Sequence, residues 1–558
     1  MTKGGLPGPL VPLFCHLSFL HLSFLDPSTP RAPLRYNAPF RARLGKTGIG
    51  EPALSDEQQT EQTPAQPENE LMRVRREKMA RIAELGWPSY PNKAHATTTV
   101  AAVVEKYSPK SAEELEASPE RVAIAGRVMA IRDFGKASFL VLSELSSRVQ
   151  IYVKKDLLSE REWELKENLD VGDWVAVEGP MMRTKKGELS VKAEKLDFLV
   201  KALRPLPEKW HGLTDTEERF RRRYLDTLMN EEVRSRFVLR SKIISALRAA
   251  LDAEGFLEVE TSMLQSLAGG ANAEPFSTHH NALDINLNLR IAPELDLKKL
   301  LIGGYSKVYE IGRSFRNEGI DVTHNPEFTT IEWYEAYSDA KKQRAFIEKM
   351  FRAIVKQVTG GATLTFDGVA IDFENPFSVM TYYEALQRYA LIGAPEKATV
   401  EELSLKAKQL GVSVAPSDSV QKIMDGIFKK AVRPKLLQPT YVISYPKGMI
   451  PLAKGDEGKA GTVDAFQFYA GGLELIKAFS ELNDPVEQAR RFNAEEGNRK
   501  VGDKEAQPND TDFVEALEYG MPPAGGVGMG IERLVMLFSD VKNIREVIFF
   551  PTLRPKSE

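Results

Sequence analysis

The amino-acid sequence predicts a multidomain α+β protein. A small N-terminal β-barrel precedes a larger domain, in which an antiparallel sheet is flanked by helices. Five short β-rich runs between residues 121 and 200 predict the barrel, and helices that alternate with strands from about residue 215 onward predict the larger domain. The length of 558 residues suffices for roughly two to four domains. A hydrophobic content of 42% is typical of globular proteins.

The first 70 residues differ in composition from the rest. An apolar part, Leu10 to Leu25, is followed by a stretch rich in Gln, Glu and Pro. Pro12 and His16 interrupt the apolar part and no small-residue cleavage pattern is clear, which disfavours a signal peptide. We expect a disordered extension, or upstream sequence translated from a wrongly placed start, with Met72 as the alternative start.

Cysteine content, apolar runs and net charge exclude several classes of protein. Cys15 is the only cysteine, which excludes an internal disulfide framework and a cysteine-based zinc site. A reducing, cytoplasmic setting is therefore expected. No run of 18 apolar residues occurs, so no membrane span is expected. With a net charge of −3, any surface that binds nucleic acid must be local.

The barrel is predicted to lie within a domain at residues 71–205. That domain begins with a helix over residues 71–86, which is rich in arginine and can either contact RNA or simply face solvent. The strand runs follow, separated by turn residues such as Gly172 and Asp173. Five strands in about 80 residues suit an OB barrel, a fold that often binds oligonucleotides but has other uses. The strand runs cover residues 121–134, 137–145, 148–155, 174–184 and 189–200.

The larger domain is expected over residues 215–558, with a helical insertion at about 380–435. Its first block of interest, residues 236–264, is an amphipathic helix that ends at Gly255 and is followed by a strand. Taken alone, this block is an ordinary helix–strand unit.

A second block, residues 312–337, places a polar loop between two β-rich runs. The loop holds an arginine that can bind a phosphate or carboxylate through two hydrogen bonds, a carboxylate that can accept from an adenine amino group, and an aromatic ring that can stack on a base. A loop that only joined two strands would not need this set. Its members, within 13 residues, are Arg316, Glu318, His324, Asn325 and Phe328.

A third block, residues 525–540, is a glycine-rich strand that turns into a helix near Ile531. The glycines allow a ligand to approach the backbone closely. The positive helix N-terminus and Arg533 could hold a polyphosphate. The block is not a Walker loop, because no Gly-Lys-Ser/Thr follows the glycines.

A fourth block, residues 471–492, carries two acidic residues seven apart, Glu474 and Glu481. On one extended strand they would face opposite sides, whereas a turn between them could bring both to one magnesium ion. A surface acidic segment is the alternative. Pro485 suits the first position of a helix, capped by the residue at 483 or at 484.

At this point a family resemblance is clear. The second and third blocks resemble motifs 2 and 3 of the class II aminoacyl-tRNA synthetases, and the first block resembles motif 1. The run GKASFLVL in the barrel is similar to the anticodon domain of the lysine-specific members. The resemblance extends over Leu71 to Pro555. Four further runs are similar to the lysine-specific members, at residues 290–304, 315–319, 324–329 and 479–485.

The resemblance implies an ATP-dependent and Mg²⁺-dependent enzyme, a homodimer, that activates L-lysine and transfers it to tRNA(Lys). By resemblance, ATP is bound by Arg316, Glu318, His324, Asn325, Phe328, Glu474 and Arg533, with Arg316 and Arg533 as the catalytic residues. By resemblance, lysine is bound by Gly270, Glu294, Arg316, Glu332, Tyr334, Asn483 and Glu487. Magnesium is assigned to Glu474 and Glu481 in the same way, and the anticodon to Phe139 and Gln150, with Arg127 and Glu178 as weaker candidates.

The sequence departs from the family pattern at three positions. Ser262 replaces the usual proline of motif 1, Glu274 replaces a basic residue and Asp296 replaces a tyrosine. Two other functions remain open: a ligase that lysylates a protein, which would lack the barrel, and a degenerate synthetase that only binds RNA or a partner. Phe139 also has an alternative role in the barrel core, because it lies in an apolar run.

Overall fold

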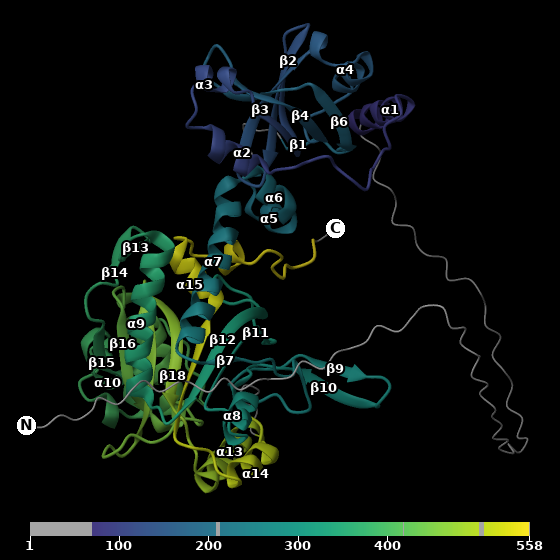
Figure 1. The fold of residues 1–558 in the computed structure, drawn as a ribbon. Coiled ribbons are helices and arrows are strands. Elements are labelled where there is room, and N and C mark those ends of the chain that lie inside the picture. The colour runs from purple at the N-terminus through teal and green to yellow at the C-terminus, as the bar shows by residue number, and fades with distance from the viewer. Residues whose placement is uncertain (1–69, 208–212, 417, 501–506, 557–558) are drawn as a thin grey trace, which may run out of the picture. The chain divides into compact units, whose positions relative to one another are not determined.

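The computed structural model describes residues 70–207, 213–416, 418–500 and 507–556 (Figure 1). The prediction for the N-terminal extension falls on residues 1–69 and lies outside the described residues. The predicted basic helix is α1 (Glu70–Glu84), followed by Gly86 at a φ of 86°. Arg75 of α1 donates to the backbone carbonyls of Val171 and Ala202, so one of its arginines holds the helix against the barrel.

The first domain is the predicted barrel, because β1 pairs with both β2 and β4 and so closes the sheet. The predicted fifth run forms two strands, β5 and β6, separated by Ala193 and Glu194. The remaining elements are α2 (Val100–Tyr107), α3 (Ala112–Ala117), β1 (Arg121–Asp133), β2 (Ala137–Glu144), β3 (Ser147–Lys154), α4 (Glu160–Glu167), β4 (Trp174–Arg183), β5 (Leu189–Lys192) and β6 (Lys195–Val200).

The second domain is built on an eight-stranded sheet in the order β15-β16-β17-β18-β19-β12-β11-β7. The inner pairs are antiparallel and the two outermost pairs are parallel. With the OB barrel, this confirms the predicted α+β fold class. The strands of this sheet are β7 (Leu257–Glu258), β11 (Lys307–Phe315), β12 (Glu327–Ala336), β15 (Ser378–Thr381), β16 (Thr440–Pro446), β17 (Thr462–Ala470), β18 (Leu473–Ser480) and β19 (Ala524–Gly530).

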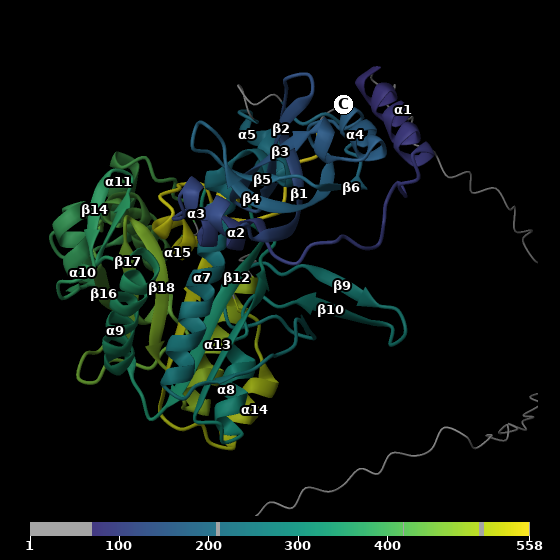
Figure 2. The same cartoon turned by 45° about the horizontal axis from the view of Figure 1, so that its top comes forward.

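Two short sheets and a set of helices complete the second domain. A hairpin formed by β9 and β10 projects from it, as both views show (Figure 2). The short strands are β8 (Leu264–Gln265), β9 (Ser277–His280), β10 (Ile285–Leu289), β13 (Thr363–Phe366) and β14 (Val369–Asp372). The helices are α5 (Thr216–Arg221), α6 (Arg223–Met229), α7 (Glu231–Ala253), α8 (Glu294–Ile302), α9 (Ala340–Thr359), α10 (Tyr382–Ala385), α11 (Val400–Gln409), α12 (Val420–Ile427), α13 (Pro485–Lys500), α14 (Thr511–Glu518) and α15 (Ile531–Phe538).

The two faces of the large sheet serve different purposes. Side chains alternate along β12, so Ile331 and Trp333 enter a core formed with α7, α9 and α15. Glu332 and Tyr334 point to the opposite face, where α8 and the helices α10–α12, between β15 and β16, contribute to a second core. The polar residues of the site therefore lie on this second face. Within the described part of the chain, no helix is long and apolar enough to cross a membrane.

Candidate active site

The loop between β11 and β12 positions the predicted arginine over an aromatic ring. The backbone N–H of Arg316 donates to the carbonyl of Pro326 at 2.8 Å, which fixes the base of the loop. The Arg316 guanidinium lies 5.1 Å from the centre of the Phe328 ring. Burial lowers the pKa of Arg316, and this shift is opposed by nearby carboxylates, those of Glu318, Glu332 and Glu474.

A second arginine approaches the same loop from α15. Arg533 Nη2 lies 3.1 Å from His324 Nε2, and Arg533 Nη1 donates to the backbone carbonyl of Glu474 at 3.2 Å. Because a guanidinium only donates, His324 Nε2 must accept, and His324 Nδ1 then donates to Asp321 at 2.7 Å. Asn325 is buried and its amide donates to the carbonyl of Glu327 at 2.7 Å. The loop and the start of α15 thus bring two arginines and a histidine together.

A cluster of buried acidic residues, which we call the acidic pocket, lies on the same face of the sheet. Its three carboxylates, from Glu294, Glu332 and Glu481, are only 7%, 7% and 1% exposed. The Tyr334 hydroxyl donates to Glu332 at 3.1 Å. Lys298, which is fully buried, places its ammonium 2.6 Å from Glu294 and 2.5 Å from Glu481.

The charges of this pocket are strongly perturbed. Burial, together with Glu294, raises the pKa of Glu332 to about 8. Burial also raises the pKa of Glu481 to about 8, although Lys298 acts in the opposite direction. Burial acts against the charge of Lys298, but Glu294 and Glu481 raise its pKa above the ordinary value. Carboxylates held in this way would be stabilised by a further cation.

Two glycines give the pocket its shape. A Cβ atom on Gly526 would lie 2.0 Å from Glu481 Oε1 and 2.4 Å from a ring carbon of Tyr334. Gly270 has a φ of 88°, and a Cβ there would lie 3.0 Å from the Cβ of Glu294. The structure therefore places Gly270 against Glu294; their role in binding the α-amino group of lysine stays a prediction.

Glu474 and Glu481 are placed differently from the expected arrangement. No turn separates them, because β18 continues from Leu473 to Ser480. The pairing with β17 shifts between Phe468 and Tyr469, which leaves Leu475 as an extra residue in β18. A bulge of this kind reverses the alternation of side chains, and it therefore turns Glu474 and Glu481 toward the same face. The expectation of a turn between the two residues was therefore wrong, and a bulge in β18 brings them to one face instead.

Residues after β18 are engaged by other protein groups. Asp484, rather than Asn483, caps α13, because its carboxylate accepts from the backbone N–H groups of Val486 and Glu487. Asn483 Oδ1 accepts from Lys454 and its amide donates to the carbonyl of Met521. The Glu487 carboxylate forms ion pairs of 2.7 to 2.8 Å with Lys447, Arg490 and Arg491. These cations lower the pKa of Glu487.

The barrel residues divide into two groups. Phe139 lies outside the barrel core, between the fully buried Ser138 and Leu140, and its ring is 5.2 Å from that of Tyr152. Gln150 points to the same face and accepts a hydrogen bond from the Ser190 hydroxyl at 2.9 Å. Of the weaker candidates, Arg127 packs over Trp174, while Glu178 forms ion pairs with Arg121 and Lys195.

Comparison with known families decides the identity of the second domain. A sequence model for the tRNA synthetases of class II (D, K and N) matches residues 215–554. The chain belongs to this class II synthetase family.

The first domain of this synthetase matches a family described as an OB-fold nucleic acid binding domain, over residues 122–199. Curated relatives cover most of the chain. The lysine–tRNA ligase of Moorella thermoacetica is 46% identical over 491 residues, 88% of this chain and 99% of the relative. The lysine–tRNA ligase of Lactococcus lactis is 47% identical over 487 residues, which are 87% of this chain and 99% of the relative. The lysine–tRNA ligase of Thioalkalivibrio sulfidiphilus is 44% identical over 499 residues, which are 89% of this chain and 100% of the relative.

One of the departures from the family pattern is accommodated locally. Asp296 accepts a hydrogen bond from the Gln265 amide at 3.0 Å. The backbone carbonyl of Glu274 accepts from the N–H of Asn317 in the motif 2 loop, at 2.7 Å, a contact that does not depend on the side chain. Ser262 is exposed, and nothing in the structure explains its replacement of proline.

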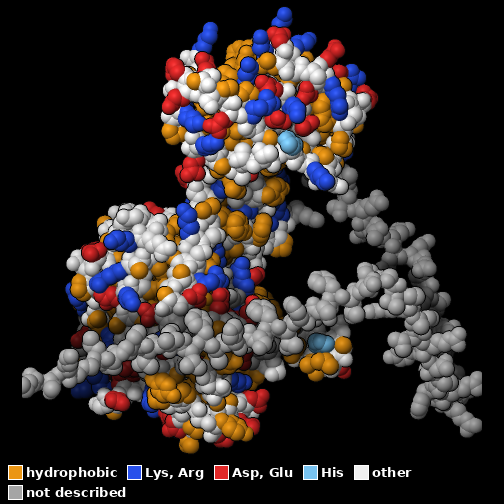
Figure 3. All heavy atoms as spheres, in the orientation of Figure 1, with side chains coloured by type: hydrophobic (Ala, Val, Ile, Leu, Met, Phe, Trp, Pro, Cys, Tyr) orange, Lys and Arg blue, Asp and Glu red, His pale blue; other side chains and the backbone are white. Residues whose placement is uncertain are grey.

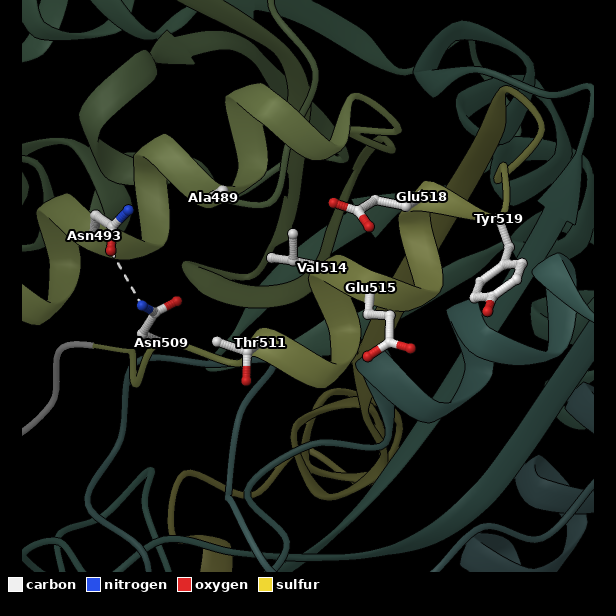
Figure 4. A pocket seen from close by; sticks show the side chains of 8 residues that line it. All are labelled: Ala489, Asn493, Asn509, Thr511, Val514, Glu515, Glu518 and Tyr519. Carbon is white, nitrogen blue, oxygen red and sulfur yellow. Dashed lines mark hydrogen bonds between the residues drawn. The ribbon is translucent and has the colours of Figure 1, made fainter.

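Sequence reasoning missed Lys298 and Asp321, which contact the predicted site residues Glu294, Glu481 and His324. Lys298 follows Glu294 by four residues on a helix, a spacing that signals an ion pair. Asp321 precedes His324 by three residues, but nothing in the sequence shows that the loop folds back on itself. A hollow of about 630 Å³ lies between α13 and α14 (Figure 4). No predicted site residue lines it.

Proposed function

We propose that this class II synthetase is a lysine–tRNA ligase. Lysine and ATP would give lysyl-adenylate and pyrophosphate, and the terminal hydroxyl of tRNA(Lys) would then displace AMP. One observation carries the proposal: a cluster of buried carboxylates lies beside Arg316, in a chain whose curated relatives are named lysine–tRNA ligases.

The acidic pocket suits the two ammonium groups of lysine. We assign the side-chain ammonium to Glu332 and Tyr334, because an ammonium removed from water needs charged and hydrogen-bonding acceptors. The α-amino group is assigned to Glu294 and Gly270, which lie against each other. Glu487 is the outer carboxylate of the pocket in this proposal. The lysine carboxylate is assigned to Arg316 and Asn483.

ATP is assigned to the motif 2 loop and to the start of α15. The Phe328 ring, packed against the Arg316 guanidinium, offers a surface for adenine. Arg316 would bind the α-phosphate, and Arg533 the γ-phosphate. The contact between Arg533 and His324 keeps both groups near the same ligand. The remaining ATP-binding residues are Glu318, Asn325 and Glu474.

The first step requires positioning rather than proton transfer. The lysine carboxylate is already ionised at neutral pH, so no general base is needed for its attack on the α-phosphate. Arg316 is placed to hold the attacking carboxylate and the phosphate together, which lowers the barrier by orientation and by charge stabilisation. Pyrophosphate leaves toward Arg533. In the second step, the tRNA hydroxyl attacks the adenylate carbonyl, and AMP leaves.

Magnesium is the proposed cofactor, held by Glu474 and Glu481. Both carboxylates face the same side of the sheet, and Glu481 Oε1 is buried without a hydrogen-bond partner among the described residues, while Oε2 pairs with Lys298. Magnesium needs one or two carboxylates when phosphate oxygens supply the rest, so these residues fit the ion. When bound, it neutralises phosphate charge. No group of three acidic, histidine or cysteine side chains suited to a metal occurs among the described residues.

The barrel favours tRNA over a protein as the acceptor. A lysylating enzyme for proteins would not need an OB domain, whereas Phe139 and Gln150 lie on the outer face of one. A phenylalanine can stack on an unpaired base and an amide can pair with the edge of uracil. Phe139 and Gln150 are thus assigned to the central anticodon base. This reaction places the proposed enzyme in the cytoplasm, with the translation machinery.

A homodimer is also proposed. Large apolar side chains are exposed on the segment that follows α7 and on the β9–β10 hairpin. A cluster of this kind on one part of a protein is typical of an interaction surface. Light scattering in solution would give the mass of a dimer, and a monomer would contradict the proposal. The exposed side chains are Leu257, Met263, Leu264, Leu267, Leu283 and Ile285.

Two assays test the proposed function. Lysine-dependent exchange of pyrophosphate into ATP should occur with lysine and with no other standard amino acid. The protein should then charge tRNA(Lys). Absence of exchange would leave the degenerate synthetase as the better description, and exchange with transfer to a protein alone would favour the protein ligase.

A further inference from the structure

A row of four side chains crosses the outer face of the barrel. Strand pairing places Arg132 opposite Phe139, Phe139 opposite Tyr152, and Tyr152 opposite Lys192. Side chains of directly opposed residues point to the same face of a sheet. The row therefore runs across β1, β2, β3 and β5, with a cation at each end and two aromatic rings between them. Three strand spacings give it a length of about 14 Å.

The row faces solvent rather than the barrel core. The neighbours of Tyr152 along β3, Ile151 and Val153, are fully buried core residues, whereas Tyr152 is half-buried. Arg132 is exposed and Lys192 is half-buried. Figure 3 shows side chains of both charges among hydrophobic ones on the visible face of this domain. A surface of mixed rings and cations is typical of sites for single-stranded nucleic acid.

The two rings of the row cannot serve one base. Phe139 and Tyr152 are tilted by 37° relative to each other, so one flat base cannot lie against both. Phe134, 67% exposed, meets Phe139 edge-on at 5.9 Å and borders that ring on another side. If Phe139 takes one base, Tyr152 is left for another.

We propose that Tyr152 is a second base-stacking residue, which takes the base next to the one on Phe139. Arg132 and Lys192 contact phosphates of the same RNA loop. The inference rests on the proposed function, since it assumes that the barrel binds an anticodon loop. The adjacent row continues the surface, because Gln150 lies opposite Val141 and Ser190. Cations and an amide around two rings favour an RNA strand over an apolar protein segment.

Binding of a synthetic anticodon stem–loop of tRNA(Lys) to the full-length protein tests the stacking residue. Tyr152→Ala should weaken binding by about 5- to 150-fold, the loss that follows removal of one stacked ring. Tyr152→Phe keeps the ring and should bind as tightly as the unmutated protein. Neither variant should change the unfolding temperature or lysine-dependent exchange. The proposal would be overturned if Tyr152→Ala bound the stem–loop as tightly as the unmutated protein, or if both variants lost binding equally.

Stem–loops that lack a single base identify which base each ring takes. Removal of the base next to the central one should cost little more once Tyr152 is alanine, because both changes delete the same contact. Removal of the central base should likewise cost little further binding once Phe139 is alanine. If the binding loss caused by Tyr152→Ala adds fully to the loss caused by removal of each base, Tyr152 stacks on no base and the inference is wrong.

The salt dependence of binding tests the two cations. Arg132→Gln and Lys192→Gln should each reduce the slope of log affinity against log salt by about 0.7. Lys341→Gln, an exposed lysine at the start of α9, is the matched control and should leave the slope unchanged. If the unmutated protein fails to charge tRNA(Lys), the proposed function itself fails. If charging of tRNA(Lys) and the effect of Phe139→Ala are as expected but the Tyr152 variants bind the stem–loop normally, only the inference of a second stacking site is wrong.

Discussion

The acidic pocket of the catalytic domain and the outer face of the barrel are built in opposite ways. In the pocket, Glu294, Glu332 and Glu481 are almost fully buried, and Lys298 pairs with Glu294 and Glu481. On the barrel, rings and cations stand at the surface, next to a core that does not include them.

The difference follows from the size of the proposed ligands. An amino acid is small and charged, so burying carboxylates beside it strengthens each contact, at a cost in desolvation that the fold must offset. An RNA loop is long and flexible, and exposed rings can take its bases without disturbing the core. Changes in the pocket should therefore affect both stability and chemistry, whereas changes on the barrel face should affect RNA binding alone.

The largest effect is expected for Glu332→Gln. The substitution keeps the shape of the side chain but removes the carboxyl group that a bound ammonium would ionise, and losing one partner of a buried charged pair costs about 2–5 kcal/mol. The Michaelis constant for lysine in pyrophosphate exchange should rise by one to three orders of magnitude, while that for ATP should change little. Glu401→Gln, an exposed carboxylate on α11, is the control. An unchanged constant for lysine would remove Glu332 from the pocket.

Gly526→Ala tests the shape of the pocket rather than its charge. The new Cβ would overlap Glu481 and Tyr334, so one of them must move, at about 1–3 kcal/mol. We expect slower adenylate formation and a lower unfolding temperature. Gly361→Ala, in the turn after α9, also has no atom within 4 Å of the new Cβ and lies outside the proposed site, so it should behave nearly like the unmutated protein. Equal behaviour of the two variants would show that the pocket is not tightly packed.

Phe139→Ala should reverse the pattern seen in the pocket. Charging of tRNA(Lys) should weaken by the equivalent of about 1–3 kcal/mol, because one stacked ring is lost. Exchange of pyrophosphate and the unfolding temperature should stay unchanged, because the ring lies outside the barrel core. A fall in the unfolding temperature with normal charging of tRNA would show that Phe139 is a packing residue after all.

The smallest effect is expected for Glu487→Gln. Its carboxylate already forms ion pairs with three cations at the edge of the protein, and such pairs contribute about 0–1 kcal/mol. The Michaelis constant for lysine should rise by less than about fivefold. A rise as large as that for Glu332→Gln would place Glu487 in the inner pocket and would mean that lysine displaces Lys447 or one of the arginines.

Local sequence patterns predicted most of the elements that hold the site. The two strands around the motif 2 loop, and the turn from β19 into α15 at Ile531, lie where alternation and glycine spacing placed them. The relative placement of the two acidic residues of β18 was harder to predict. Whether Glu474 and Glu481 share a face depends on the extra residue in β18, which is defined only by pairing with β17. The sequence of one strand does not show the register in which it pairs with its neighbour.

The sequence by itself determined the α+β class, the OB barrel, the order of the motifs and the residue types available for chemistry. These follow from short-range periodicity and from spacing along the chain. Only the tertiary structure decided that Lys298 joins Glu294 to Glu481, that Phe139 lies outside the core and that Lys447 pairs with Glu487. Each depends on which segments, distant in sequence, pack together, because burial and ion pairing are properties of that packing.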